Sequence, residues 1–168
     1  MSLTGRPDLV AAATFDNDGF WPELSTADLL SRYRVPSDIA DDVVPTALQM
    51  AVFRVNESLD DVKAAIVLLG FATLQLYVDA HPQPLGDSDK LVVGYEHAVY
   101  SRAKAGLIPQ FVNAVRRSKD DGKAQSEADE GEQYWLDESQ SMIAAFHRML
   151  LPGNDLKPGN GNVHVALI

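Results

Sequence analysis

The longest helical pattern in this chain runs from Asp87 to Ser118 and constrains the fold more than any other feature. Apolar and small residues recur on one of its faces at the 3.6-residue period of an α-helix: Leu91, Val92, Tyr95, Ala98, Val99, Ala103 and Gly106. The opposite face carries Lys90, Gly94, His97, Ser101 and Lys104. We therefore predict a core helix capped by Ser88, with a kink or break at Pro109 because proline lacks the backbone donor.

Further helical patterns predict an all-α fold, a small bundle of about four main helices. The clearest is a heptad-like seam ending before Gly70, formed by Leu48, Val52, Val55, Leu59, Val62, Ile66 and Leu69. Pro45 either kinks a helix that Ser37 caps or lies in the first turn of a new helix. Ser25 begins a short helix that ends near Arg32, and residues 124–151 form the last helix.

The segments between these helices predict loops and one uncertain element. Residues 71–79 alternate in part between apolar and polar side chains, which indicates a short strand or an extended loop. Residues 81–87 and 119–123 have the composition of loops. Residues 16–19, Asp-Asn-Asp-Gly, predict a turn, because the ligand spacing that a calcium loop requires is missing.

The patterns divide the chain into three parts. Residues 1–19 predict a flexible N-terminal arm, and residues 20–153 a helical domain. Residues 154–168 combine a polar linker with an apolar tail, Val163 to Ile168, that favours an extended or β-strand conformation. This tail either folds back on its own domain or adds as a strand to a neighbouring molecule.

The charge of the chain argues against an unaided duplex-binding surface. Its 24 acidic and 14 basic side chains give a net charge of −10, whereas DNA binding requires clustered lysine and arginine to replace counterions. The basic cluster at Arg116, Arg117 and Lys119 is interpreted as a complement to a helix C-terminus. No apolar run approaches the ~20 residues that span a bilayer, and no signal peptide is evident, so we expect no membrane partner.

No constellation typical of catalysis is present, so we predict no enzyme activity, no catalytic or metal-binding residue and no cofactor. The sequence has no cysteine, no glycine-rich phosphate loop and no zinc-protease or serine-hydrolase motif. The four histidines are dispersed, at His81, His97, His147 and His164. His97 follows Glu96, but adjacent helical residues point about 100° apart, so we interpret His97 as a solvent-facing or interface residue.

Several apolar residues exceed what one helix face requires and are candidate contacts with another subunit or protein. Trp21 either fills the core or anchors in a partner, and Met50 and Phe53 are either covered by the N-terminal arm or contact another subunit. Residues 87–118 carry a second apolar row, Val93, Tyr100 and Leu107, which packs either against internal neighbours or against another subunit. The full candidate set is Phe20, Trp21, Met50, Phe53, Val93, Tyr100, Leu107, Val163, Val165, Leu167 and Ile168.

One sequence motif comprises residues 95–107, Tyr-Glu-His-Ala-Val-Tyr-Ser-Arg-Ala-Lys-Ala-Gly-Leu, followed by Gly122-Lys123 and Ala128-Asp129. It closely resembles the phage head completion protein (GPL) family of temperate contractile-tailed phages. Further similarity lies in Phe20-Trp21-Pro22, in Asn56 to Leu59 and in the closing Val165 to Ile168. The likeness runs from about Asp16 to the end. It departs at His97, where the family typically has arginine, and a few residues are additional between Asp38 and Val52.

This resemblance implies a structural protein of the virion that assembles in the host cytoplasm. It implies that the chain joins the portal vertex after DNA packaging, stabilises the filled head and offers a platform for the tail. The implied partners are the portal protein, tail-completion components and neighbouring copies in a ring, commonly a dodecamer, that encloses DNA without reading its sequence. The alternative is a helical assembly chaperone or regulatory module that is not retained in the virion.

Overall fold

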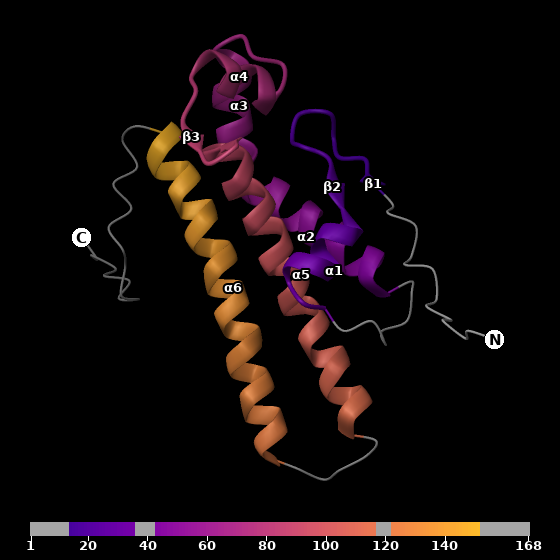
Figure 1. Ribbon diagram of the computed structural model, residues 1–168. Coiled ribbons are helices and arrows are strands. Elements are labelled where there is room, and N and C mark those ends of the chain that lie inside the picture. The colour runs from indigo at the N-terminus through magenta and orange to yellow at the C-terminus, as the bar shows by residue number, and fades with distance from the viewer. Residues whose placement is uncertain (1–13, 36–42, 117–121, 152–168) are drawn as a thin grey trace, which may run out of the picture.

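The computed structural model describes residues 14–35, 43–116 and 122–151, and within these ranges the fold is predominantly helical (Figure 1). Two long helices lie side by side, a third crosses behind them, and two short helices gather at one end. The all-α prediction is therefore confirmed. The elements in order are β1 (Thr14–Phe15), β2 (Leu24–Ser25), α1 (Thr26–Arg32), α2 (Val43–Ser58), α3 (Asp60–Leu68), α4 (Leu74–Ala80), β3 (Pro84–Leu85), β4 (Ser88–Asp89), α5 (Lys90–Arg116) and α6 (Gly122–Leu150).

Helix α5 is the centre of the fold because it packs against α6 and also against α2. The predicted inner face is buried at Leu91, Tyr95, Ala98, Val99 and Ala103, whereas Gly106 is exposed. The second row is buried at Tyr100, 1% exposed, and at Leu107, 0% exposed, whereas Val93 is half-buried. A helix with packed neighbours on two sides needs apolar residues in both rows.

The face of α5 predicted to be polar is only partly open to solvent: Lys90 is exposed, whereas Gly94 and His97 contact α6. Ser101 is fully buried, and a Cβ atom added at Gly94 would lie 3.2 Å from Phe146 Cε2 on α6. The α6 residue Ser139 is also fully buried. Small side chains here let the two helices approach each other closely, and a small residue gives no hydrophobic signal to the sequence pattern.

Ser139 yields a prediction about the α5–α6 contact. Its hydroxyl is buried without a hydrogen-bond partner among the described residues, which costs free energy. The Ser139→Ala variant removes that hydroxyl and keeps the small volume, so we expect the free energy of unfolding to rise by up to about 1 kcal/mol in a urea titration. A loss of stability of that size would show that an ordered water or another group satisfies the hydroxyl.

The start of α5 differs in detail from the prediction. Asp89, rather than Ser88, precedes the helix, and its Oδ1 accepts a hydrogen bond from Leu91 N at 2.9 Å. Ser88 instead pairs with Leu85 in the β3–β4 hairpin, whose turn includes Gly86 at φ +63°. The predicted loop over 81–87 therefore contains one strand of a hairpin. Helix α5 continues through Pro109 to Arg116, so the chain does not break there.

The seam along α2 and α3 is confirmed from Leu48 to Ile66, and Pro45 lies in the first turn of α2. The exception is Leu69, which is 66% exposed. Helix α3 ends at Leu68 with Leu69 as its C-cap, and the chain turns at Gly70, at φ +95°, whose N–H donates to the Val67 carbonyl.

Residues 74–80 form a helix, so the predicted strand or loop over 71–79 is wrong. Thr73 caps α4, since its side-chain oxygen accepts a hydrogen bond from Leu76 N at 3.1 Å. Leu74 and Val78, four residues apart, bury the inner face of this short helix. Apolar residues at every second position, Leu74, Leu76 and Val78, suggested a strand, but Leu74 and Val78 are also one helical turn apart.

Part of the predicted N-terminal arm belongs to the folded domain. Strand β1 pairs with β2, and Asp18 Oδ1 accepts hydrogen bonds from Phe20 N and Trp21 N in the predicted turn. Ser25 caps α1 as predicted, through a 3.4 Å hydrogen bond from Asp28 N.

Other predictions lie outside the described residues. These are the arm over 1–13, the Ser37 cap, the basic residues Arg117 and Lys119, and the linker and tail over 154–168. Within the described ranges, no helix combines the length and the apolar content that crossing a bilayer requires.

Candidate interaction surfaces

Three residues of the motifs that resemble the family, Trp21, Asn56 and Tyr95, meet in one polar and aromatic cluster. The rings of Trp21 and Tyr95 stack with centroids 4.7 Å apart and planes within 2°. The Tyr95 hydroxyl accepts from Asn17 Nδ2 and donates to Asn56 Oδ1, both at 2.7 Å, and Asn56 Nδ2 donates to Asn17 Oδ1 at 2.9 Å. This closed ring of hydrogen bonds joins the β1–β2 connection to α2 and α5. Asn56 and Tyr95 of the resembling motifs therefore stabilise the fold.

Burial raises the pKa of the Tyr95 hydroxyl well above its ordinary value, and it raises the pKa of Tyr33 to about 12. Both side chains therefore remain neutral hydrogen-bonding groups at physiological pH. The Tyr100 hydroxyl, whose pKa is also raised by burial, accepts a hydrogen bond from Ser25 N at 2.9 Å. These tyrosines fasten the N-terminal segment to α5 without any catalytic geometry.

His97 lies half-buried between α1, α5 and α6 rather than on an open polar face. Its Nδ1 is 2.7 Å from Tyr33 Oη, and its Nε2 is 3.3 Å from Glu138 Oε2. The neighbouring Glu96 pairs instead with Arg32 at 3.2 Å. The adjacent Glu96 and His97 thus serve separate contacts, and their side chains do not form an acid–base pair.

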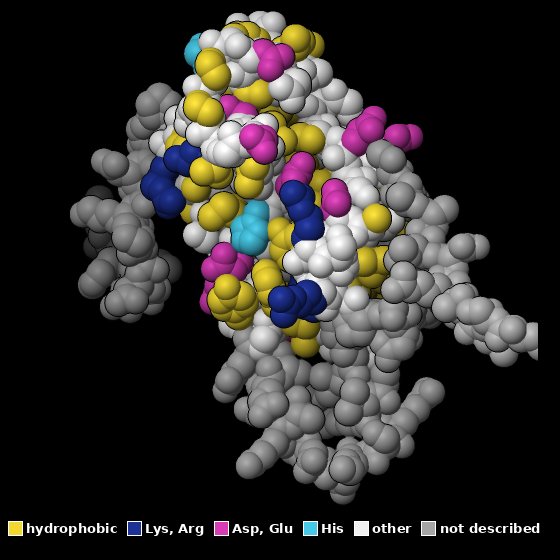
Figure 2. Space-filling view, viewed as in Figure 1, with side chains coloured by type: hydrophobic (Ala, Val, Ile, Leu, Met, Phe, Trp, Pro, Cys, Tyr) yellow, Lys and Arg dark blue, Asp and Glu magenta, His cyan; other side chains and the backbone are white. Residues whose placement is uncertain are grey.

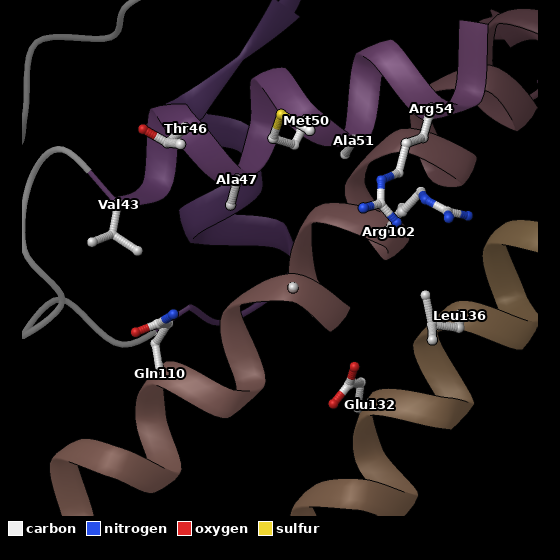
Figure 3. Close-up of a pocket in the computed structure, with 11 residues that line it drawn as sticks. Val43, Thr46, Ala47, Met50, Ala51, Arg54, Arg102, Gln110, Glu132 and Leu136 are labelled. Carbon is white, nitrogen blue, oxygen red and sulfur yellow. The ribbon is translucent and has the colours of Figure 1, made fainter. Parts of the chain in front are cut away.

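A groove of about 560 Å³ lies between α2, α5 and α6, and it contains two arginines (Figure 3). The side chains of Arg54 on α2 and Arg102 on α5 lie side by side at one end of it. Desolvation lowers the pKa of Arg102, and the positive charge of Arg54 lowers it further. The other lining residues are Val43, Thr46, Ala47, Met50, Ala51, Gly106, Gln110, Glu132 and Leu136. We call this the dibasic groove.

A second feature is a set of exposed apolar side chains where α3 ends and α4 begins, which we call the apolar end surface: Val67, Leu68, Leu69 and Leu76. Leu68 is 87% exposed and the others are 49–66% exposed. Hydrophobic side chains are visible at this end of the molecule in Figure 2. An apolar group of this kind is typical of a surface that contacts another protein.

The predicted interface residues fall into three groups. Phe20, Trp21, Tyr100 and Leu107 are at most 4% exposed, so we assign these four to the core of the single chain as a correction. Met50 and Phe53 are 48% and 62% exposed, and Val93 is half-buried in a small apolar groove between α5 and α6. Val163, Val165, Leu167 and Ile168 lie outside the described residues.

Sequence reasoning missed both the dibasic groove and the apolar end surface. Arg54 and Arg102 are far apart in the chain, and nothing in the sequence indicates that their side chains meet. Val67 and Leu68 did carry a signal, because they are apolar although they lie outside the seam that Ile66 and Leu69 continue.

The chain matches the family described as phage head completion protein (GPL) over residues 15–149, which is most of its length. This chain belongs to that family. It is similar to a probable head completion/stabilization protein of Haemophilus phage HP1 (strain HP1c1), with 25% identity over 109 residues, covering 65% of this chain and 71% of the relative. No solved structure matches. Membership makes this a virion-associated structural protein of the phage head, which confirms the resemblance in residues 95–107.

Proposed function

We propose that this head completion protein joins the portal vertex of the filled head after DNA packaging. There it closes and stabilises the head, forms a ring with copies of itself around the DNA channel and provides the platform for tail attachment. The portal protein and tail-completion components are the partners of this proposal. DNA passes through the ring without sequence-specific contacts, in keeping with the net charge of −10.

The observation that carries the proposal is the apolar end surface, in which Leu68 is the most exposed large apolar side chain among the described residues. Burying large side chains such as Leu68 against a partner removes apolar area from water, and this supplies a driving force of about 25 cal/mol per Å². Helices α3 and α4 present this surface at one end of the molecule, where α3 packs against α6 and α4 against α5 (Figure 1). This arrangement supports an attachment role for that end.

A double variant tests the attachment surface in phage particles. Leu68→Asp/Leu69→Asp places two charges on exposed positions, so we expect the helicity and thermal midpoint of the isolated chain to stay near wild type. We expect the variant to be lost from purified heads, and complementation of a phage lacking this gene to fail. The matched control, Gln140→Asp/Ser141→Asp on the exposed side of α6, adds the same charge and is expected to support growth.

The readout is mass spectrometry of mature particles together with cryo-electron microscopy of their vertices. Wild-type protein in a ring at the portal vertex is the expected result. Its absence from mature virions would overturn the connector proposal and favour an assembly chaperone or regulatory module. Normal incorporation of the Leu68→Asp/Leu69→Asp variant would overturn the role of the apolar end surface.

A further inference from the structure

The dibasic groove contains two like charges whose side chains lie next to each other. Among the residues that the structure describes, neither the Arg54 nor the Arg102 guanidinium has a recorded hydrogen bond or ion pair. Other charged side chains of residues 95–107, the motif that contains Arg102, do have partners. Glu96 pairs with Arg32, and Lys104 donates to the Arg34 carbonyl at 3.2 Å. Arg102 is partly buried and Arg54 is exposed beside it, and two adjacent cations that lack an ion pair among the described residues favour the binding of an anion.

The lining of the groove indicates which kind of anion fits. Apolar walls are formed by Val43, Ala47 and Met50 of α2, which extend along the groove away from the arginine end, and by Leu136 of α6 (Figure 3). Glu132 adds a negative charge to the same lining. A nucleic-acid backbone presents repeated charge and has no apolar side that would bury these walls. A carboxylate on an apolar protein segment can pair with the two arginines, while the apolar part of the segment packs against the apolar walls.

The chain itself carries such a segment on the edge formed by the end of α2 and the start of α3. Phe53 is 62% exposed, Glu57 follows it by one helical turn, and Asp60 begins α3; both carboxylates are exposed. Among the described residues, neither carboxylate has a recorded ion pair. We call these three residues the acidic edge. It supplies an aromatic ring for the apolar walls and carboxylates for the two arginines.

We propose that the dibasic groove is a contact site for a second copy of this chain, and that Glu57 and Asp60 of that copy pair with Arg54 and Arg102 while Phe53 packs against the apolar walls. The inference rests on the proposed function for its setting, since it names the residues through which copies in the ring meet. One chain carries both halves of the contact, so the contact can repeat from copy to copy.

Two charge-reversed variants test the contact in the full-length chain. In Arg54→Glu/Arg102→Glu both the groove and the edge are acidic, and in Glu57→Arg/Asp60→Arg both are basic. Each variant alone is expected to self-associate at least about tenfold more weakly than wild type in sedimentation velocity, as expected for losing close interfacial charge pairs. An equimolar mixture is expected to recover association as a heteromer, which also shows that both variants fold.

The matched control is Arg34→Glu/Arg148→Glu, which reverses two exposed arginines outside the groove and makes the same change in net charge. We expect it to associate as wild type does. The inference is overturned if wild type stays monomeric at its highest soluble concentration, if the mixture does not associate, or if the control weakens association equally. Binding of a random-sequence DNA duplex that requires Arg54 and Arg102, without self-association, would overturn it in favour of a nucleic-acid site.

These outcomes are separable from failure of the proposed function. Self-association that follows the charge rule would stand even if particles lacked the protein at the portal vertex. Conversely, a ring at the vertex in which Arg54→Glu/Arg102→Glu incorporates as well as wild type would retain the connector role and overturn this contact.

Discussion

Replacing Trp21 by alanine is expected to lower the free energy of unfolding by about 3–5 kcal/mol. Trp21 is 3% exposed, stacks on Tyr95 and meets Phe146 edge-on at 6.1 Å between ring centroids. It therefore joins the N-terminal segment to both α5 and α6, and its loss leaves a cavity at their junction. Against a total of about 5–15 kcal/mol for a domain, this loss decides whether the chain stays folded on warming.

The measurement is a urea titration of the Trp21→Ala variant followed by helical circular dichroism. The matched control is Trp21→Phe, which keeps an aromatic ring and removes an indole N–H that is buried without a partner among the described residues. We expect this control to lose less than half as much stability. A Trp21→Ala variant within about 1 kcal/mol of wild type would contradict the core assignment of this residue.

Removing the hydroxyl of Tyr95 is expected to cost about 1–3 kcal/mol, although the Tyr95→Phe substitution leaves the buried ring in place. The hydroxyl makes 2.7 Å hydrogen bonds to both Asn17 and Asn56, and both amides lose a partner in the variant. The penalty comes from these unsatisfied amide groups and not from lost apolar contact. The same urea titration measures it.

Tyr134→Phe is the matched control for this prediction, because Tyr134 is 56% exposed and has no recorded hydrogen bond to any residue that the structure describes. Its stability is expected to stay within about 0.5 kcal/mol of wild type. A double-mutant cycle of Tyr95→Phe with Asn56→Ala is expected to give a non-additive result, since the two residues share one hydrogen bond. Strict additivity would show that the Asn56–Tyr95 contact contributes nothing to stability.

Local signals in the sequence located most of the helices. Periodicity identified α5, α6 and the seam of α2 and α3, and the caps at Ser25 and Gly70 act over one turn and are read directly from neighbouring residues. Helix α4 was missed because seven residues are too few to separate a helical period from a two-residue alternation. Its cap at Thr73 was the better signal.

The sequence could not show how many neighbours a helix has, so it left the surroundings of the second apolar row of α5 open. Tyr100 and Leu107 form a second apolar row that fits a subunit contact or an internal one equally well, and the packing of α5 between α2 and α6 makes it internal. Leu69 was predicted to be buried because it continues the apolar seam in sequence. It is exposed instead, and it lies directly after the end of α3.

The sequence by itself determined the helical class and the main helix caps. The sequence motif at residues 95–107 also indicated membership of the head completion family. These features depend on residues near one another in the chain. Only the tertiary structure decided which faces are buried, that Asn17, Asn56 and Tyr95 close one hydrogen-bonded ring, and that Arg54 and Arg102 share a groove. Each of these depends on contacts between distant segments, which packing of the whole chain creates and no local pattern encodes.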